Sequence, residues 1–334
     1  MTAGAAGRRT RAAGVAGAPA AGGAAALVSL LFIVAPASAQ PAPDPPPRLH
    51  VEVVGARAVL SPADLDTLVD YETAIVDHLR TQQVQQTHEG DLGKMARAFP
   101  IGARVVRTFG RQLSLGAGFS WFASSRGSSA KASYSYTVVD PTAQYYQRSF
   151  SETITIDPLD LTIHEYFAHA VVRYDWIARP RLRLGTSLHA GWLVAECTAR
   201  RGRTITGGFY PTYRANTTEL DGRGNGPAGD ALLTARVALT RRLGVLAEAG
   251  YALHEIRKVT GSSRTTAVTQ DGEATSVELE QTTESRGRWT NEAVTYQTGN
   301  GLYRGTVPAV GGQGNPFTLS LSGWRVRLGV SVGL

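Results

Sequence analysis

Apolar residues alternate with small or polar residues along several stretches of this 334-residue chain, and the alternation is clearest at its end. From Trp324 to Leu334 every second residue is apolar, and arginine, glycine or serine occupies the positions between them. Successive side chains of a strand point to opposite faces. This period of two therefore predicts a β-strand with one apolar face and one polar face.

Three pairs of similar segments are each separated by a very short turn, as expected for antiparallel hairpins. The pairs run from Phe99 to Trp121, from Tyr166 to Trp192 and from Ala235 to Leu253, and they turn at Gly110-Arg111, at Ala178 to Pro180 and at Arg241-Arg242. Because the members of each pair are so close in sequence, we expect them to be neighbours in one sheet.

One further strand, Arg48 to Val59, precedes these pairs, and Trp324 to Leu334 completes a set of eight. Three short turns would then lie at one end of the strands and four long connections at the other. This asymmetry is typical of outer-membrane barrels. The predicted fold class is therefore all-β membrane: an eight-stranded antiparallel up-and-down transmembrane β-barrel with long external loops and one loop helix.

The four long connections lack the regular alternation and are expected to be external loops. They span Ser61 to Arg97, Ser124 to Asp157, Glu196 to Asp230 and Ile256 to Ser320. In the first, apolar residues recur at near-helical spacing after Ser61-Pro62, which predicts a helix to about Gln83. The third is Gly-rich and polar. The fourth is the longest, and we expect it to be the most mobile.

The second connection, from Ser124 to Asp157, contains two alternating arms of its own. Arg148 and Glu152 fall on the same face of the second arm as Tyr146 and Phe150. Charges on that face would be costly against lipid. The pattern therefore favours an external hairpin over a fifth transmembrane pair.

The N-terminal residues have the organisation of a secretory signal. Arginines precede an apolar stretch of about 12 residues, shorter than the roughly 20 that a transmembrane helix needs. A cleavage site follows Ala39, and a proline-rich linker comes next. We expect residues 1–39 to be a signal peptide, residues 40–47 a linker and residues 48–334 the barrel domain. The expected location is the outer membrane.

Composition narrows the choice of function. Removal of the signal would leave 31 basic and 27 acidic residues, a net charge of +4, from the 34 and 27 of the whole chain. Basic residues are not interleaved with aromatics in a run, so nucleic-acid binding is not expected. The single cysteine, Cys197, excludes an internal disulfide, and it is interpreted as a passive thiol at the base of a loop.

Four of the tryptophans have positions that suit membrane interfaces. Trp121, Trp192 and Trp324 lie about ten to twelve residues from the far end of their strands, which is close to the 9–11 residues of a transmembrane strand. They are expected at the outer interface. Trp176 lies next to a short turn and is expected at the inner interface.

The hairpins Val105–Phe122 and Leu239–Leu253 and the ending Leu319–Leu334 resemble the superfamily of small outer-membrane barrels, such as the OmpA transmembrane domain, OmpX and OmpW. The resemblance covers Arg48 to Leu334, in patterning more than in any diagnostic motif. It implies the barrel-assembly machinery as a partner that reads the final strand, and outer-membrane lipid and lipopolysaccharide as surroundings. That strand usually ends in Phe in the superfamily, whereas this chain ends in Leu334.

The inward faces of the predicted strands carry the charged residues. We expect a lumen network made of Glu52, His169, Arg173, Asp175, Arg183, His189, Arg236, Glu248, His254, Arg325 and Arg327. An eight-stranded barrel is just wide enough for side chains to fill its interior. Unpaired buried charges are costly, so these residues are interpreted as a structural plug of ion pairs.

Two motifs invite a sharper interpretation. Ser187 and His189 share the inward face of one strand, and together with an acid they could serve a lipase or acyltransferase. Residues two apart on a strand are about 7 Å apart at the backbone, so a hydrogen bond between them is not assured. Gly222 to Gly229 lacks the strand, helix and lysine of a phosphate-binding loop and is interpreted as a flexible surface loop.

A zinc-protease signature is suggested by His164-Glu165 and His169, but the spacing is wrong. The motif needs two histidines four residues apart on a helix. Here they are five apart, and on a strand an odd separation sends the two side chains to opposite faces. We therefore expect no metal site, no other cofactor and no catalytic residues.

Fold alone does not give function. The sequence favours a non-enzymatic outer-membrane protein with a structural or surface-recognition role that resides in its four external connections. The alternative is a narrow channel or carrier for a small solute, apolar solutes included.

Overall fold

The computed structural model describes residues 49–60, 62–81, 86–139, 147–207, 212–271, 279–298 and 301–334. The expected signal peptide and proline-rich linker lie outside these ranges. The described part of the chain contains no helix that is both long and apolar enough to span a membrane.

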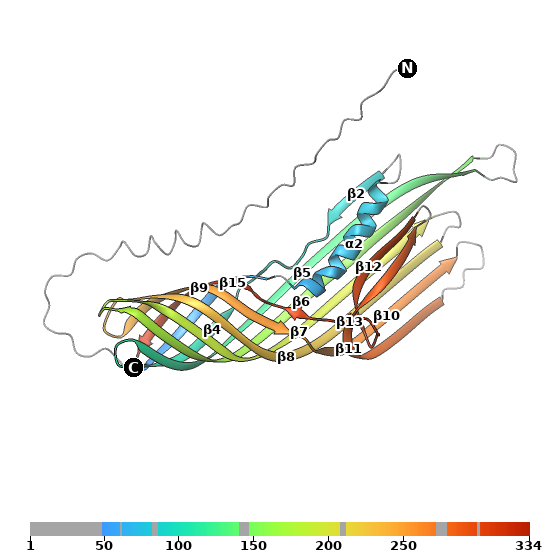
Figure 1. The fold of residues 1–334 in the computed structure, drawn as a ribbon. Coiled ribbons are helices and arrows are strands. Elements are labelled where there is room, and N and C mark those ends of the chain that lie inside the picture. The colour runs from blue at the N-terminus through green and yellow to red at the C-terminus, as the bar shows by residue number, and fades with distance from the viewer. Residues whose placement is uncertain are drawn as a thin grey trace, which may run out of the picture. The chain divides into compact units, whose positions relative to one another are not determined.

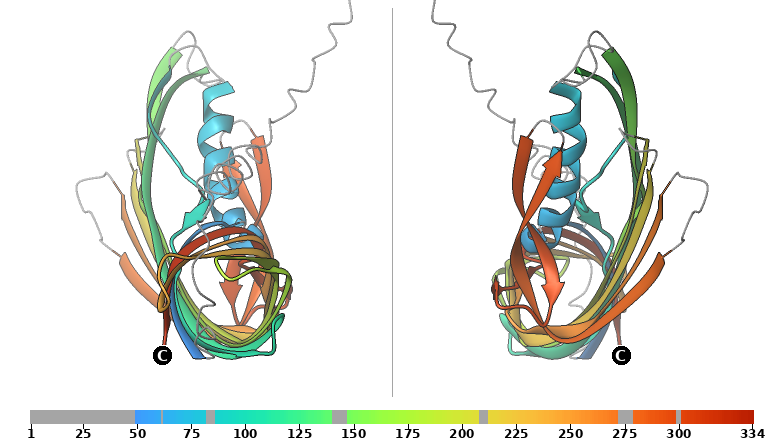
Figure 2. Two further views of the ribbon diagram at one scale, coloured as in Figure 1. Left: turned by 90° about the vertical axis from the view of Figure 1, so that its left-hand side faces the viewer. Right: turned by 90° about the vertical axis from the view of Figure 1, so that its right-hand side faces the viewer.

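Eight antiparallel strands form a closed ring (Figures 1 and 2). They are β1 (Leu49–Val59), β4 (Ile101–Phe109), β5 (Leu113–Val139), β6 (Gln147–Ala178), β7 (Leu182–Gly207), β8 (Thr212–Ala238), β9 (Leu243–Ile256) and β15 (Gly323–Gly333). Each strand pairs with the next, and β1 pairs with both β4 and β15, which closes the ring. The eight predicted strands are confirmed.

The alternation in the sequence matches the two faces of the ring. Along β4, exposed and buried side chains alternate without interruption. The exposed ones are mostly apolar on the outside, such as Leu188 at 58 % and Leu328 at 57 %. The buried ones point into the lumen and include most of the charged residues. The ring is therefore apolar outside and polar inside, the reverse of a soluble protein.

The three short turns lie at the predicted positions. They join β4 to β5 at residues 110–112, β6 to β7 at 179–181, and β8 to β9 at 239–242. Gly110 has a φ of +65°, which glycine adopts without steric cost. His50 pairs with Gly333, so the start of β1 and the end of β15 lie at this same end of the ring.

The connections at the other end are not loops, and this part of the prediction was wrong. β7 and β8 stay paired from Leu182↔Val237 to Gly207↔Thr212, so the stretch Glu196 to Asp230 is regular strand. The hairpin expected between Ser124 and Asp157 is present, but it continues β5 and β6 beyond the ring.

The stretch Ile256 to Ser320 was expected to be the most mobile loop, yet it contributes five strands. They are β10 (Val259–Asp271), β11 (Leu279–Thr298), β12 (Gly301–Val310), β13 (Asn315–Pro316) and β14 (Leu319–Ser320). β10 pairs with β8 and β11, and β11 pairs with β12, so these strands widen the sheet that leaves the ring. The sequence pattern did not reveal these strands, because they are rich in Thr and Ser and both of their faces contain polar residues.

Gly222 to Gly229 was interpreted as a flexible loop and is instead part of β8, paired with β7 along its whole length. Its glycines allow close packing. A Cβ atom on Gly222 would lie 2.7 Å from the ring of Trp289, which is fully buried on β11. Glycine is required here because another side chain occupies the space, and not because the backbone bends.

The predicted helix is confirmed as α2 (Ala63–Thr81), and its expected limit near Gln83 lies outside the described residues. Two small strands follow it: β2 (Gln86–Asp91) pairs with β5, and β3 (Arg97–Ala98) pairs with β1. Figure 2 shows α2 inside the curve of the long strands, with β12 on its other side. We call α2, β2, β10 to β13 and the parts of β5 to β8 beyond the ring the extension.

The extension has an apolar core of its own. Side chains of α2 pack against the inward faces of the long strands and against β12. The core includes Leu65, Leu68, Ile75, Ile154, Ile156, Leu161, Leu193, Trp289, Val310 and Phe317. Cys197 belongs to it, in the middle of β7 and 1 % exposed. Its expected place at the base of a loop was therefore wrong.

Candidate functional site

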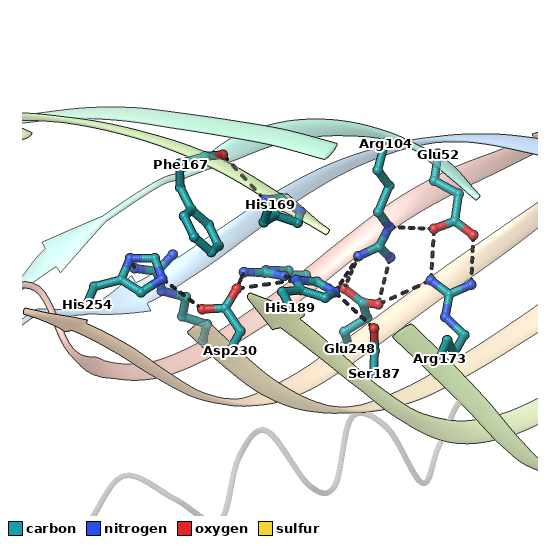
Figure 3. A network of polar contacts seen from close by, with 12 residues as sticks. Glu52, Arg104, Phe167, His169, Arg173, Ser187, His189, Asp230, Glu248 and His254 are labelled. Carbon is teal, nitrogen blue, oxygen red and sulfur yellow. Dashed lines mark hydrogen bonds and ion pairs between the residues drawn. The ribbon is translucent and has the colours of Figure 1, made fainter. Parts of the chain in front are cut away.

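The lumen of the ring holds the residues that the parity of the strands placed there (Figure 3). All eleven predicted members of the network point inward, and all but Arg183 are buried. Ion pairs and hydrogen bonds join ten of them along the axis of the ring, from the short turns to the base of the extension, and His169 contacts the set through ring stacking.

The first cluster, nearer the short turns, contains two carboxylates and two arginines. Glu52 accepts hydrogen bonds from Arg104 at 2.5 Å and from both terminal nitrogens of Arg173 at 2.9 Å. Arg104 also donates to both oxygens of Glu248, at 2.6 and 3.1 Å. These side chains are at most 2 % exposed. Each carboxylate thus faces more than one guanidinium, which compensates its burial.

The second cluster lies nearer the extension. Asp230 is in contact with Arg327 and accepts a hydrogen bond from Nε2 of His254 at 3.0 Å. Nδ1 of His254 lies 3.1 Å from Glu165, and Arg325 donates to the same carboxylate at 3.3 Å. Strands on opposite sides of the ring are therefore joined across the lumen.

Aromatic rings occupy the space between the charges. Phe167 lies 4.6 Å from His254 and 4.7 Å from His169, measured between ring centroids. His169 is stacked on His189 at 4.8 Å. Gly118 makes room for this stack, because a Cβ atom there would lie 2.8 Å from Nε2 of His169. A pocket beside the network holds about 10 Å³, which is close to the space that one water molecule needs.

Ser187 and His189 lie within hydrogen-bonding distance of each other, which their spacing along the strand did not guarantee. The Ser187 hydroxyl lies 2.9 Å from Nε2 of His189, and Nδ1 of His189 lies 3.3 Å from Asp230. These are the contacts of a nucleophile, a base and an orienting acid. However, Ser187 is fully buried. Arg104 and Arg327 also lie within 3.2 and 2.9 Å of the two ring nitrogens.

No protein-family model matches this chain, and no characterised protein matches it. The resemblance to small outer-membrane barrels stays a prediction that rests on patterning.

Three members of the network were missed at the level of sequence. Arg104 alternates with Ala103 and Val105, and Glu165 shares parity with His169, so the period of two could have placed both. Asp230 was assigned to the end of a loop, where side chains do not alternate between two faces and the sequence position does not predict direction. Its place in β8, opposite His189 on β7, is set by the register of the two strands.

The histidines of the protease-like motif lie on opposite faces of β6. His164 is on the outer face, whereas Glu165 and His169 are buried in the lumen. Across the described ranges, no group of three or more histidine, cysteine, aspartate or glutamate side chains could hold a metal ion.

The predicted interface aromatics lie on the outside of the ring. Trp176, Trp192 and Trp324 are 53, 54 and 66 % exposed, and Trp121 is 38 % exposed. Tyr251 packs against Trp324 edge to face, with a centroid distance of 5.8 Å. The fifth tryptophan, Trp289, is buried in the extension and has no counterpart among them.

A further buried ion cluster, separate from the two in the lumen, lies in the extension and was not predicted. Glu72 of α2 is fully buried and accepts hydrogen bonds from Arg203 at 2.5 Å and from Arg201 at 3.1 Å. Both arginines come from β7, and Arg203 also lies over the ring of Tyr71. The cluster fixes the helix to the sheet at one position and one rotation.

Proposed function

We propose that this chain is a non-enzymatic outer-membrane protein, in which a plugged eight-stranded barrel anchors the extension outside the cell as a rigid recognition or structural element. The observation that carries the proposal is the belt of exposed apolar side chains around the ring. Every strand contributes to it, for example Val53, Val105, Leu115, Val172, Leu188, Leu233, Leu253 and Leu328. A soluble protein rarely leaves so large a continuous apolar surface exposed.

The height of the ring supports a membrane location. Three of the four strands that do not pass into the extension have the length that crossing requires: β1 and β15 have 11 residues each and β4 has 9, against about 9–11 for a transmembrane strand. The fourth, β9, has 14 residues. On β7 the outer face changes from Trp192 to Glu196 within four residues. We place the outer boundary of the membrane at this change.

The outer surface of the extension supports a location in water. Across five neighbouring strands, charged residues of alternating sign lie directly opposite one another: Asp160, Arg200, Glu219, Arg264 and Glu284. Exposed pairs of this kind contribute little stability. They keep this face of the sheet polar, so it is suited to contact water or a polar partner and not lipid.

The content of the lumen argues against the alternative of a channel or carrier. Buried ion pairs and stacked rings occupy the cross-section, and the pocket beside them holds only about one water molecule. The same packing argues against catalysis at Ser187, because its side chain is fully buried.

The decisive experiment is gel mobility of the outer-membrane fraction with and without boiling. We expect the protein in that fraction, with faster migration before boiling than after, because folded barrels resist detergent. Recovery of the full chain in a soluble periplasmic extract would contradict the proposal.

A further inference from the structure

Two arginines lie directly opposite each other at the end of the lumen that carries the short turns. Arg183 of β7 pairs with Arg236 of β8 in the register of the two strands, and both side chains point inward. Like charges in directly opposed positions destabilise a sheet. This pair therefore requires compensation by negative charge.

The carboxylates of the lumen do not supply enough negative charge to compensate both arginines. Asp175 binds Arg183 at 3.2 Å. Glu52 already binds two other arginines, and its nearest oxygen is 3.8 Å from Nη1 of Arg236, beyond hydrogen-bonding distance. Nη1 of Arg236 is buried and has no hydrogen-bond partner among the described residues.

The charged side chains of the lumen carry a net positive charge. Six arginines (104, 173, 183, 236, 325 and 327) face the five carboxylates of Glu52, Glu165, Asp175, Asp230 and Glu248. The other five arginines each lie within 3.4 Å of a carboxylate, whereas the ion pair of Arg236 with Glu52 is 3.8 Å long, so Arg236 is the least compensated of the six. Its side chain is 10 % exposed and that of Arg183 is 14 % exposed. Arg183 is the second residue of β7 and Arg236 lies two residues before the end of β8, so both are next to short turns and accessible from that end of the ring.

We propose that Arg183 and Arg236 form a binding site for a small oxyanion, a phosphate or a carboxylate, which enters the lumen from the end with the short turns. Planar guanidinium groups match the geometry of such anions and bind them through paired hydrogen bonds. An anion between the two side chains would give Nη1 of Arg236 its missing acceptor and separate the like charges. Both side chains face the lumen, so the source is a free anion and not the headgroup of a surrounding lipid.

The test measures thermal unfolding of the full chain in an uncharged detergent, with sodium phosphate added and with sodium chloride at matched ionic strength. We expect phosphate to raise the Tm in a saturable manner, beyond the effect of chloride. Arg236→Gln should weaken this response by about tenfold or more in half-saturating concentration. Without phosphate, the same variant should lose no stability, because it removes the least compensated charge of the lumen.

Arg179→Gln is the matched control, because Arg179 is exposed in the short turn after β6 at the same end of the ring. It should respond to phosphate as the unaltered protein does.

If Arg236→Gln does not fold, the phosphate response of Arg183→Gln is measured and interpreted in the same way. An equal response of the lumen variant and the unaltered protein, or no response beyond chloride, would overturn the site. A response only to phosphatidylglycerol vesicles would assign it to a lipid headgroup instead. None of these outcomes depends on where the protein resides in the cell.

Discussion

The hydroxyl of Ser187 lies 2.9 Å from Nε2 of His189, although the two residues are only two positions apart on one strand. Asp230 completes the arrangement on the other side of the imidazole. In a serine hydrolase, the histidine must accept the proton of the serine and become positively charged. Here Arg104 and Arg327 already lie beside the ring. The imidazolium would face two positive charges, so the arrangement is better suited to packing than to catalysis.

The folded protein should therefore not react with a fluorophosphonate probe for nucleophilic serines. We expect the unaltered protein and Ser187→Ala to give the same background labelling in detergent. A serine esterase in the same detergent serves as the positive control. Labelling that disappears in Ser187→Ala would identify a reactive Ser187 and contradict the non-enzymatic proposal.

The apolar belt predicts a position-dependent cost of charge. Leu188 lies near the middle of the ring on the outer face of β7, and Leu188→Arg should lower the free energy of unfolding in lipid vesicles by about 2–4 kcal/mol. Thr198→Arg places the same side chain on the same face of the same strand, ten residues further on. It should have little effect, and equal costs for the two variants would contradict the membrane boundary near Glu196.

The lumen network predicts a large cost when a carboxylate is neutralised. Glu248→Gln leaves Arg104 under-compensated and should cost about 3–5 kcal/mol, because the pair is buried. Glu219→Gln, in an exposed pair with Arg200, should cost about 0–1 kcal/mol. Urea unfolding in vesicles measures both values.

Planar-bilayer conductance of the same protein separates the plug from a channel. The unaltered protein and Glu248→Gln should both be silent, because the rings of the lumen remain packed. A stable Glu248→Gln variant with altered ion selectivity would support the alternative of a narrow channel.

The extension should be less stable at neutral pH than at mildly acidic pH. Burial raises the pKa of Asp66 on α2 to about 6, and the nearby Asp70 adds to the rise. The unfolded chain has an aspartate pKa near 3.9. Folding therefore takes up a proton between these values, and the resulting stability is fully present below about pH 4 and is lost as the pH rises through 6.

Hydrogen exchange of α2 at pH 5 and pH 7.5 measures this effect. Asp66→Asn should remove most of the difference between the two pH values. Glu89→Gln alters an exposed carboxylate of β2 and should leave the difference intact. If Asp66→Asn retains the full pH dependence, another group is responsible for it.

Cys197 should be protected from alkylation as long as the extension is folded. Burial raises its pKa to about 12, and the thiol is 1 % exposed. Since the thiolate is the reactive form, a maleimide should modify the residue only after denaturation. Thr198→Cys in a Cys197→Ser background places a thiol on the exposed face one position later and should react at once. Equal rates for the two thiols would place Cys197 at the surface.

The sequence was sufficient for the ring because each of its strands follows one simple rule. From Trp324 to Leu334, one face is apolar throughout and the other is polar or small, so the period of two is unbroken. The same parity assigned the eleven lumen residues to one face. It could not pair them, because partners such as Glu52 and Arg173 are 121 residues apart and meet only through the closure of the ring.

The extension was not recognised because its strands follow another rule. From Glu219 to Gly224, charged residues alternate with Leu220 and two glycines. The glycines lie on the inner face because Trp289 and Ile256 occupy the space beside them. The inner face of this segment is therefore apolar in the folded protein, because side chains of other strands fill the space beside its glycines.

Segments from the beginning and from the end of the described chain contact each other in both the ring and the extension. β1 pairs with β15 to close the ring, and the backbone N–H of Thr318 donates to Asp64 of α2, 254 positions earlier. A chain that stops before about residue 318 would leave β1 with one unpaired edge and would leave part of the apolar face of α2 uncovered. An incomplete product would thus expose an unpaired strand edge and an apolar helix face, two features that favour association with other chains. The chain therefore stays prone to association until its last strand is in place.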